Sequence, residues 1–528
     1  MIKKYLYLAI VLQLTLIVSA QKNPQVKVEQ GTLEGIILKS GIQNYRGIPY
    51  AEPPVGELRW KEPQPAKKWS GIRQANTFGN KPMQQPIFSD MIFRAPAMSE
   101  DCLYLNVWTP AKKPDEKLPV LVYFYGGGFI AGDGSENRYD GESLAEKGIV
   151  TVTLNYRLGI FGFFSHPELT KESPNHASGN YGLLDQNAAL LWVKKNIAAF
   201  GGDPDKITIA GESAGSISVS AHMASLLSKD LIRGAIGQSG AMINPTLAAI
   251  PLADAEKYGS DYAQKINSTT IMQLRAIPAQ ELLEKSSGNF NARATVDGYF
   301  LATQPSEAFN GGYQSQIPLL IGWTSAETPY MAFMQGQYPN PENYKKRVQE
   351  TYKDWATEIL KKYPGNNEKQ VIESATALGS DAFIVYSTWK WAELQKSSSK
   401  KPIYVYIFSK QRPQLKSEIG NAKEDNKMPA AMKGANHASD IEYALGNLAS
   451  NTFYDWTADD YKASATMENY FANFIKTGNP NGSSLPEWSP SGFDNGLNIM
   501  NIDANSKALD EEHRDRYLLL DSYFTVKK

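Results

Sequence analysis

The stretch Ile207-Thr208-Ile209-Ala210-Gly211-Glu212-Ser213-Ala214-Gly215 joins a short apolar run to the pattern G-x-S-x-G. Residues 216–227, which follow, are small and rich in serine, and we expect them to form a helix. A strand that turns sharply into a helix at this pattern is a nucleophile elbow, which presents the serine hydroxyl at the apex of the turn. The flanking glycines permit the turn because they lack a Cβ atom. The sequence therefore predicts that Ser213 is a nucleophile.

Several other apolar runs have the length and the β-branched or aromatic character of buried strands. They cover residues 120–124, 149–154, 319–323 and 403–408. Between the second run and the elbow, residues 183–199 carry apolar side chains at helical spacing. This alternation predicts an α/β fold, with a mostly parallel central sheet and helices on both faces.

The first twenty residues have the layout of a secretory signal peptide, with Lys3-Lys4, an apolar stretch and the small-residue exit Val18-Ser19-Ala20. A membrane anchor is the alternative, but the apolar stretch is short and is interrupted by Gln13 and Thr15. We expect residues 1–20 to be removed and residues 21–528 to form a single domain. The protein is therefore predicted to be secreted or periplasmic.

Composition excludes several classes of partner and cofactor. Lysine plus arginine (54) nearly balances aspartate plus glutamate (55), so neither nucleic acid nor an anionic membrane is an expected partner. Cys102 is the only cysteine, which excludes an intramolecular disulfide and a cysteine zinc cluster. Export without disulfides favours a bacterial origin. We expect no metal and no cofactor.

A serine nucleophile needs a base, and the chain has five histidines. His222 lies about 13 Å along the same predicted helix and cannot reach back to Ser213. In proteins with a nucleophile elbow of this kind, the base follows the serine and the acid in chain order. This order disfavours the two histidines at positions 166 and 176, which precede Ser213. His513 stands in a charged stretch typical of a solvated surface. His437 remains as the predicted base.

The acid that orients the base should follow a strand between Ser213 and His437. Glu327 follows the run 319–323 by four residues, and Asp297 and Glu307 are competing candidates.

The oxyanion that forms when a serine attacks a carbonyl group needs converging backbone N–H groups. The turn Gly126-Gly127-Gly128 follows the run 120–124 and can approach a ligand closely, and the N–H of Ala214 would be a further donor. A phosphate-binding loop is the alternative, but the residues that such a loop needs after the glycines are absent.

Longer motifs surround these residues and carry a family resemblance. The chain resembles the type-B carboxylesterases, the cholinesterase-like branch of the α/β-hydrolases, over nearly all of residues 21–528. The motifs are Tyr45-Arg46-Gly47-Ile48-Pro49-Tyr50-Ala51-Glu52-Pro53-Pro54, Ser99-Glu100-Asp101-Cys102-Leu103, Asn155-Tyr156-Arg157-Leu158-Gly159, Gly179-Asn180-Tyr181-Gly182-Leu183-Leu184-Asp185-Gln186, Phe200-Gly201-Gly202-Asp203-Pro204 and Thr477-Gly478-Asn479-Pro480-Asn481-Gly482.

The resemblance implies an α/β-hydrolase fold and a role for each candidate residue. Ser213 would be the nucleophile, His437 the base and Glu327 the acid, in preference to its competitors. The oxyanion donors would be Gly127, Gly128 and Ala214. The resemblance also implies two structural ion pairs, Arg46–Glu100 and Arg157–Asp185.

The chain departs from the family pattern in the loop of residues 77–98. Many members pair the cysteine that matches Cys102 with an upstream cysteine, but the expected position near Pro82 has none. Cholinesterases bind choline with a tryptophan in this loop, and an ungapped count places Ile92 there instead. The aromatic surface for a cation is therefore missing at that position. Two smaller departures are Tyr125, where many esterases have histidine, and Thr328, where glycine is usual.

Together these features predict an exported carboxylic ester hydrolase that acts through an acyl-enzyme. Two alternatives remain open within hydrolases: a lipase, and an esterase for plant phenolic (feruloyl-type) esters. An alternative of another class is a non-catalytic adhesion module, since some proteins of this fold bind partners and have lost the serine. Acyl length, alcohol preference and oligomeric state are not predicted.

Overall fold

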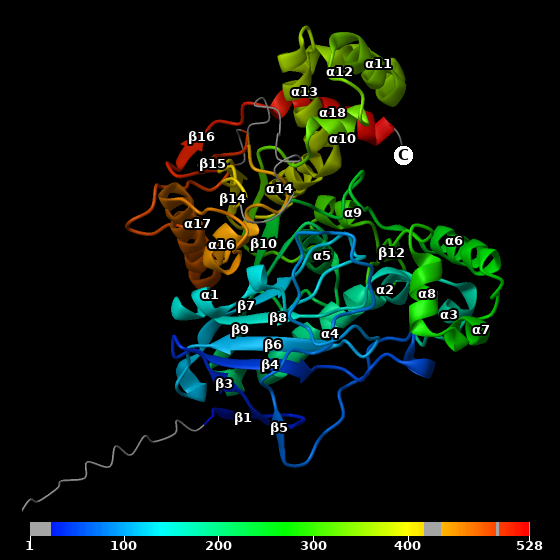
Figure 1. Cartoon of the computed structure of the whole chain (residues 1–528), viewed down its shortest axis with the longest axis vertical. Helices are drawn as coiled ribbons and strands as arrows, with labels where there is room; N and C mark the ends of the chain where they lie inside the picture. Colours follow the sequence, from blue (N-terminus) through cyan, green and yellow to red (C-terminus); the bar gives the residue numbers. More distant parts are fainter. Residues whose placement is uncertain (1–22, 417–433, 493–495, 527–528) are drawn as a thin grey trace, which may run out of the picture.

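The computed structural model describes residues 23–416, 434–492 and 496–526. Its centre is an eleven-stranded sheet with the order β16-β15-β14-β13-β10-β9-β7-β8-β6-β4-β3 (Figure 1). In chain order these strands are β3 (Ile36–Ile37), β4 (Gln43–Pro49), β6 (Tyr104–Thr109), β7 (Leu118–Phe124), β8 (Val150–Leu154), β9 (Gly202–Glu212), β10 (Gly234–Gln238), β13 (Leu319–Thr324), β14 (Ile403–Phe408), β15 (Ile499–Ile502) and β16 (Lys507–Leu509).

The middle of the sheet is parallel and its two edges are antiparallel. Strands β15, β14, β13, β10, β9, β7 and β8 pair in parallel. Strands β3, β4, β6 and β16 add antiparallel pairs outside them. Every residue of β8, β10 and β13 is buried, as expected for strands covered on both faces. The predicted α/β fold with a mostly parallel sheet is confirmed, and all five predicted strands are present.

Two small sheets lie outside the main one. The first contains β1 (Gln25–Val28), β2 (Gly31–Glu34) and β5 (Ile72–Gln74), and the second contains β11 (Ile250–Pro251) and β12 (Thr295–Val296).

Helices cover both faces of the main sheet. A side chain at Gly237 would contact Trp391 of α14 (Tyr386–Ser398) and Ser216 of α5 (Ala214–Ala224), whereas one at Gly234 would approach Phe474 of α17 (Ala458–Thr477). Because residues an odd number apart on a strand face opposite sides, α5 and α14 lie on one face and α17 on the other. Other helices near the sheet are α1 (Glu142–Glu146), α2 (Gly159–Phe163), α4 (Tyr181–Asn196), α9 (Pro305–Asn310) and α16 (Ile441–Ala444).

Two further groups of helices lie beside the sheet (Figure 1). One gathers α3 (Pro167–Glu172), α6 (Leu252–Lys265), α7 (Ile271–Ala276) and α8 (Ala279–Ser286) around a separate apolar cluster. The other contains α10 (Tyr330–Met334), α11 (Pro341–Tyr352), α12 (Ala356–Lys362), α13 (Glu368–Ser380) and α18 (Arg514–Val526). A π-helical turn, Asp381–Val385, links α13 to α14.

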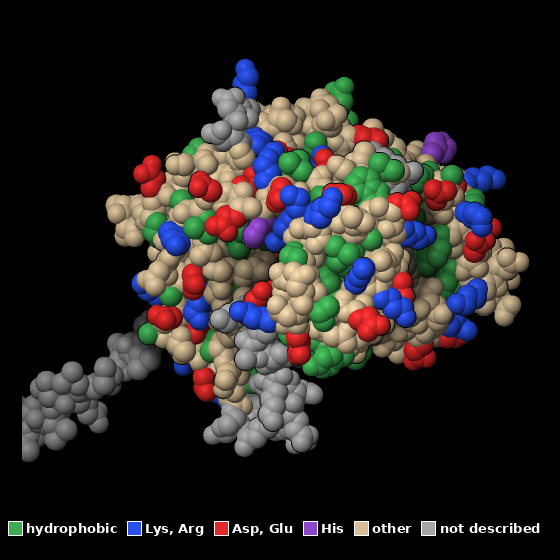
Figure 2. Space-filling view, turned by 90° about the horizontal axis from the view of Figure 1, so that it is seen from above, with side chains coloured by type: hydrophobic (Ala, Val, Ile, Leu, Met, Phe, Trp, Pro, Cys, Tyr) green, Lys and Arg blue, Asp and Glu red, His purple; other side chains and the backbone are tan. Residues whose placement is uncertain are grey.

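The proposed signal peptide, residues 1–20, lies outside the described residues. In the part of the chain that the structure describes, none of the helices is long and apolar enough to cross a membrane. Acidic and basic side chains are interspersed over the face seen in Figure 2, in line with the near balance of charges in the sequence.

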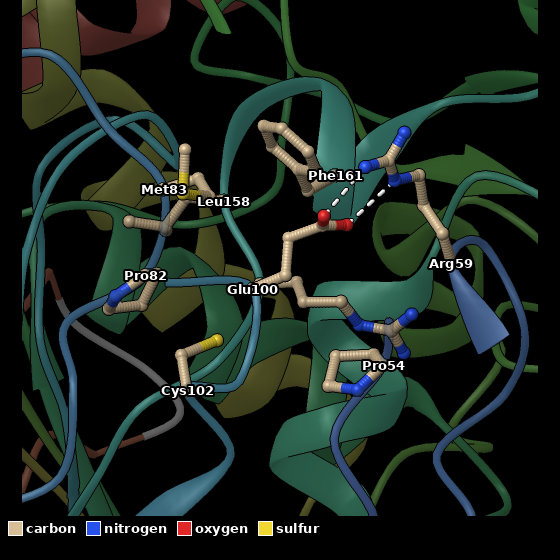
Figure 3. A pocket seen from close by; sticks show the side chains of 9 residues that line it. Pro54, Arg59, Pro82, Met83, Glu100, Cys102, Leu158 and Phe161 are labelled. Atoms are coloured by element: carbon tan, nitrogen blue, oxygen red, sulfur yellow. Dashed lines mark hydrogen bonds and ion pairs between the residues drawn. The ribbon is translucent and has the colours of Figure 1, made fainter. Parts of the chain in front are cut away.

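One of the two expected ion pairs is present, and the expectation of the other is wrong. Arg157 and Asp185 form a buried pair with Nη2 and Oδ1 2.7 Å apart. Glu100 is paired with Arg59 through two hydrogen bonds of 2.7 and 2.6 Å, not with Arg46 (Figure 3). The Arg46 guanidinium lies instead over the ring of Phe78. The sequence could not separate the two arginines because the choice depends on packing between distant segments: Arg59 also donates hydrogen bonds to the backbone carbonyls of Leu274 and Ile277.

Candidate active site

The predicted elbow is a strand–turn–helix unit formed by β9, Ser213 and α5. Ser213 has φ 54° and ψ −121°, a strained conformation for a residue with a side chain. A Cβ atom on Gly215 would come within 2.0 Å of the carbonyl oxygen of Phe124, and one on Gly211 would come within 2.5 Å of the Gly215 backbone. Only glycine fits at these two positions, so the G-x-S-x-G pattern follows directly from the tightness of the turn.

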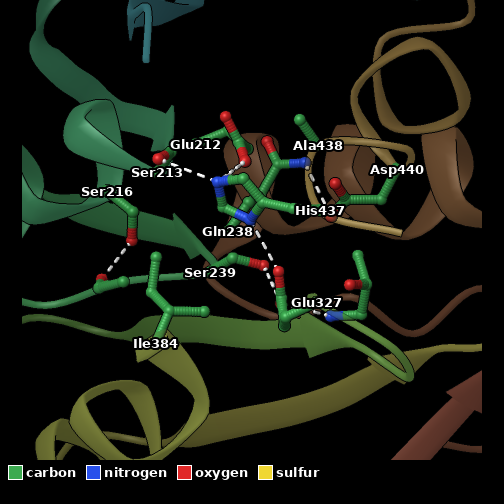
Figure 4. Close-up of polar contacts among 12 residues, drawn as sticks. Glu212, Ser213, Ser216, Gln238, Ser239, Glu327, Ile384, His437, Ala438 and Asp440 are labelled. Atoms are coloured by element: carbon green, nitrogen blue, oxygen red, sulfur yellow. Dashed lines mark hydrogen bonds and ion pairs between the residues drawn. The ribbon is translucent and has the colours of Figure 1, made fainter. Parts of the chain in front are cut away.

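The three residues predicted to act together lie within hydrogen-bond distance of one another (Figure 4). Ser213 Oγ is 2.9 Å from His437 Nε2, and His437 Nδ1 is 2.6 Å from Glu327 Oε2. Ser213 follows β9 and Glu327 follows β13, so both lie at the carboxyl ends of parallel strands, where such sheets bind ligands. In this arrangement, the serine hydroxyl can give its proton to the imidazole, whose other nitrogen faces a carboxylate.

Glu327 is fixed by donors that the sequence did not indicate. Its Oε1 accepts hydrogen bonds from Ser239 Oγ at 2.6 Å and from the Thr324 backbone N–H at 2.8 Å. Ser239 directly follows β10, a strand too rich in glycine to be recognised in the sequence. These bonds leave Oε2 free to face His437, so Ser239 orients the acid.

Replacing Glu327 with glutamine is expected to lower kcat by on the order of 10⁴-fold, because an amide cannot stabilise an imidazolium and favours the wrong tautomer. The measurement is kcat for a p-nitrophenyl ester at saturating substrate, with Asp297→Asn as the matched control. Asp297 accepts backbone hydrogen bonds from Tyr299 and Leu301 in its own turn, which is a structural role. A large loss in the Asp297 variant with an active Glu327 variant would reverse the choice of acid.

The glycine turn after β7 lies against the elbow. Gly127 and Gly128 have φ 109° and 64°, and a Cβ on Gly126 would lie 3.1 Å from Ser213 Cβ. Among the described residues, none accepts a hydrogen bond from the N–H groups of Gly127 and Gly128. Ala214 is the first residue of α5, so its N–H also has no partner within the helix. Three backbone donors are thus available beside the serine.

Glu212 is a second carboxyl group beside the histidine, and it was hidden in the variable position of the elbow pattern. Its Oε1 lies 3.3 Å from His437 Nε2, and the side chain is buried. Burial raises the pKa of Glu212 to about 8. The carboxyl group therefore gives up its proton at a higher pH than an ordinary glutamate, and its titration is coupled to that of His437.

The pKa of His437 reflects opposing influences. Burial alone would lower it, but the nearby carboxyl groups of Glu212 and Glu327 raise it to about 9. Because Glu212 and His437 are so close, they titrate as a coupled pair. The net direction is upward from the ordinary value of 6.5.

We expect kcat/KM to decrease as the pH is lowered, and the midpoint of this decrease should lie between pH 6.5 and about pH 9. The base must be neutral to accept a proton, and a raised pKa keeps the imidazole protonated to higher pH, so activity rises as pH passes through that value. The measurement is a pH profile with an ester that has no titrating group. A midpoint below 6.5 would show that the carboxyl groups do not raise the pKa of the base.

The remaining described histidines have other environments. The His222 ring is buried, with Nδ1 2.7 Å from Ser228 Oγ and Nε2 3.0 Å from Gln186 Oε1. Burial lowers the pKa of His222 to about 3, so the ring is neutral, and both of its nitrogens have hydrogen-bond partners. His166 accepts the Glu168 N–H at the start of α3. His176 and His513 are exposed.

The loop of residues 77–98 lies over the glycine turn and is held by ion pairs. Arg94 bonds Asp140 at 2.8 Å, and Asp90 bonds Arg138 at 3.1 Å. The methyl group of Met91 would be 3.2 Å from a Cβ on Gly127, whereas Ile92 is exposed. The loop residue next to Gly127 is therefore Met91.

Cys102 is free and buried. It lines a cavity of about 10 Å³ together with Pro82 and Met83 (Figure 3). The segment around Pro82 thus lies beside Cys102, as the resemblance implies. In the described ranges, no group of three or more His, Cys, Asp or Glu side chains is arranged to hold a metal ion.

Comparisons with known proteins define the class. The model of the carboxylesterase family matches residues 22–518. Fumonisin B1 esterase of Sphingopyxis macrogoltabida is 32% identical over 491 residues, covering 87% of this chain and 83% of the relative. Pyrethroid hydrolase Ces2e of Rattus norvegicus is 34% identical (85% and 80% covered), and cocaine esterase of Homo sapiens is 33% identical (85% and 82%).

The chain belongs to the carboxylesterase family, and its fold is that of the α/β-hydrolases. It is an enzyme that hydrolyses carboxylic esters, as the sequence predicted. The alternative of a non-catalytic adhesion module is set aside.

Proposed function

We propose that this esterase uses Ser213, His437 and Glu327 as a catalytic triad and passes through an acyl-enzyme. His437 Nε2 takes the proton of Ser213 Oγ as that oxygen attacks the ester carbonyl carbon. The same nitrogen then protonates the leaving alcohol oxygen, and a water molecule activated by His437 releases the acid. The observation that carries the proposal is the pair of contacts of 2.9 and 2.6 Å that join the three side chains.

The N–H groups of Gly127, Gly128 and Ala214 would hold the oxyanion of each tetrahedral intermediate. Removing one such donor typically raises the activation barrier by about 3 kcal/mol. Support comes from their position beside Ser213 and from the lack of an acceptor for the N–H groups of Gly127 and Gly128 within the described ranges. No metal or cofactor enters this chemistry. The N-terminal pattern of residues 1–20 supports export of the enzyme from the cell.

The substrate class is neutral carboxylic esters. The relatives named above are a fumonisin esterase, a pyrethroid hydrolase and a cocaine esterase, which suggests that the family site accepts diverse alcohol groups. The direct test is turnover of short-chain p-nitrophenyl esters by the purified enzyme. Steady release of nitrophenol well above the uncatalysed rate supports the proposal, and its absence in a folded sample refutes it.

A choline ester is expected to be a poorer substrate than a neutral butyrate ester of similar size. No tryptophan occurs in the loop of residues 77–98, and the side chain beside the oxyanion donors is the thioether of Met91. A cation–π contact is worth about 0.5–2 kcal/mol, or up to about thirty-fold in affinity at tenfold per 1.4 kcal/mol.

The measurement is kcat/KM for butyrylcholine against a neutral butyrate ester with a leaving group of matched reactivity. A higher value for butyrylcholine would contradict this expectation and would mean that another aromatic ring at the site takes the cation.

A further inference from the structure

The side-chain amide of Gln84 bonds the backbone of the segment that follows the glycine turn. Its Nε2 donates a hydrogen bond to the Gly132 carbonyl at 2.8 Å, and its Oε1 accepts one from the Gly132 N–H at 2.9 Å. The same nitrogen also donates to the Pro82 carbonyl, at 3.1 Å. Only 5% of Gln84 is exposed, so these bonds lie away from solvent. The amide thus pairs with Gly132 as a residue of a neighbouring strand would, and it fixes the backbone there.

Gly132 lies against the start of the turn that carries two of the proposed oxyanion donors. It has φ 126°, and a Cβ atom on it would overlap the ring of Tyr125 and lie 2.7 Å from the Gly126 carbonyl oxygen. Within the turn, the Gly127 carbonyl accepts a hydrogen bond from the Ala131 N–H at 3.0 Å. The two ends of this loop therefore touch each other. A shift of Gly132 would displace Gly126 and Gly127 through direct contacts.

The other parts of the same loop are held by the segment that follows β8. The rings of Tyr125 and Tyr156 are stacked, with centroids 4.4 Å apart, and each hydroxyl donates a hydrogen bond to the backbone carbonyl of the other residue. The Phe129 carbonyl accepts a hydrogen bond from the Gly159 N–H at 2.7 Å. At Gly132, by contrast, Gln84 bonds both the N–H and the carbonyl. The far end of the loop therefore depends on a side chain.

Gln84 belongs to the loop of residues 77–98, which is fastened to the same segment a second time. Arg94 Nε donates a hydrogen bond to the Ser135 carbonyl at 2.6 Å, and the Arg94 backbone N–H donates one to Ser135 Oγ at 2.9 Å. A disulfide cannot make this connection, because the chain has a single cysteine. Hydrogen bonds of Gln84 and Arg94 join the loop to the segment after the glycine turn instead.

We propose that Gln84 is a positioning residue for the oxyanion donors: through Gly132, it holds the N–H groups of Gly127 and Gly128 where the oxyanion forms. This inference rests on the proposed triad and oxyanion donors. Backbone donors lower the barrier because they are already in place, so that no reorganisation is needed during the reaction. An interaction made with the oxyanion, and not with the ground-state ester, raises kcat without changing KM. Loss of the Gln84 amide should therefore slow the chemical steps and leave substrate binding almost unchanged.

The test uses Gln84→Met, which keeps an unbranched side chain of similar size and removes the amide. With a short p-nitrophenyl ester, kcat is expected to fall about tenfold, or about 1.4 kcal/mol, while KM changes less than about twofold. Rates are expressed per active site, counted by labelling Ser213 to completion with a fluorophosphonate. A purely structural role for Gln84 would lower the thermal midpoint without changing this rate, so thermal unfolding is measured alongside.

A second readout is the affinity for a trifluoromethyl ketone that resembles the substrate. Ser213 Oγ adds to the carbonyl carbon of this inhibitor, the serine proton passes to His437, and the carbonyl oxygen becomes an oxyanion. The inhibition constant in Gln84→Met is expected to rise about tenfold, by the same factor as kcat falls, because both depend on the same donors.

Gln85→Met is the matched control, because it removes the next amide in the loop, which is partly exposed, and it should keep the wild-type kcat. An unchanged kcat per active site or an unchanged inhibition constant in Gln84→Met would overturn the proposal, and so would an equal loss in Gln85→Met. If Gln84→Met does not fold, Gln84→Asn, whose amide is one methylene short of Gly132, is judged by the same criteria. Failure of the proposed triad is distinguished by the wild-type enzyme, which would then turn over no ester and take up no label at Ser213.

Discussion

Ser213→Ala is expected to lower kcat for a p-nitrophenyl ester by on the order of 10⁶-fold, the usual effect of removing a triad nucleophile. No other side chain of the turn can take its place, because Ala214 has no nucleophilic atom and the buried carboxyl group of Glu212 faces His437. The fold should be retained, since the hydroxyl of Ser213 lies at the apex of the turn and bonds His437 Nε2. The thermal midpoint of the variant should therefore stay close to that of the wild type.

The control for this variant is Ser522→Ala, which removes an exposed hydroxyl from α18 and should keep full activity. Both variants are assayed at saturating substrate, and far-UV circular dichroism is recorded for each. A Ser213→Ala enzyme that kept a tenth of the wild-type activity would show that the elbow serine is not the nucleophile.

His437→Ala is expected to reduce kcat by a similar factor, on the order of 10⁶-fold, because members of a triad act as a unit. The variant has no base for Ser213 Oγ and no acid for the leaving alcohol. The decisive comparison is with His513→Ala, which removes an exposed imidazole and should retain most activity.

His222→Ala has a different expected outcome. The ring is buried and bonded to Ser228 and Gln186, so its removal should destabilise the protein by about 2 kcal/mol or more. Activity per folded molecule should remain. An inactive His513→Ala enzyme of normal stability, or an active His437→Ala enzyme, would contradict the choice of base.

Local sequence signals predicted the fold well where the physical constraint was itself local. The elbow was recognisable because Gly211 and Gly215 leave no room for side chains, and β14 was predicted at its observed bounds because its residues are all apolar or aromatic. β10 was missed because its glycines weaken the strand signal, although tertiary pairing with β9 and β13 forms it.

Contacts between distant segments were harder to predict. Ser239 and Glu212 were missed as neighbours of the triad because their importance comes from distances across the sheet. The pairing of Glu100 with Arg59 also depends on how the chain folds back on itself. The bonds between Gln84 and Gly132 were missed for the same reason, since these two residues lie in different segments of the chain.

The most direct test of the account is to map the residue that becomes covalently modified. The active enzyme is treated with a fluorophosphonate, which forms a stable adduct with an activated serine, and is then digested and analysed by peptide mass spectrometry. The account predicts stoichiometric modification of Ser213, with complete loss of activity and no labelling of Ser213→Ala. Stoichiometric labelling at another residue, with loss of activity and an unmodified Ser213, would contradict it.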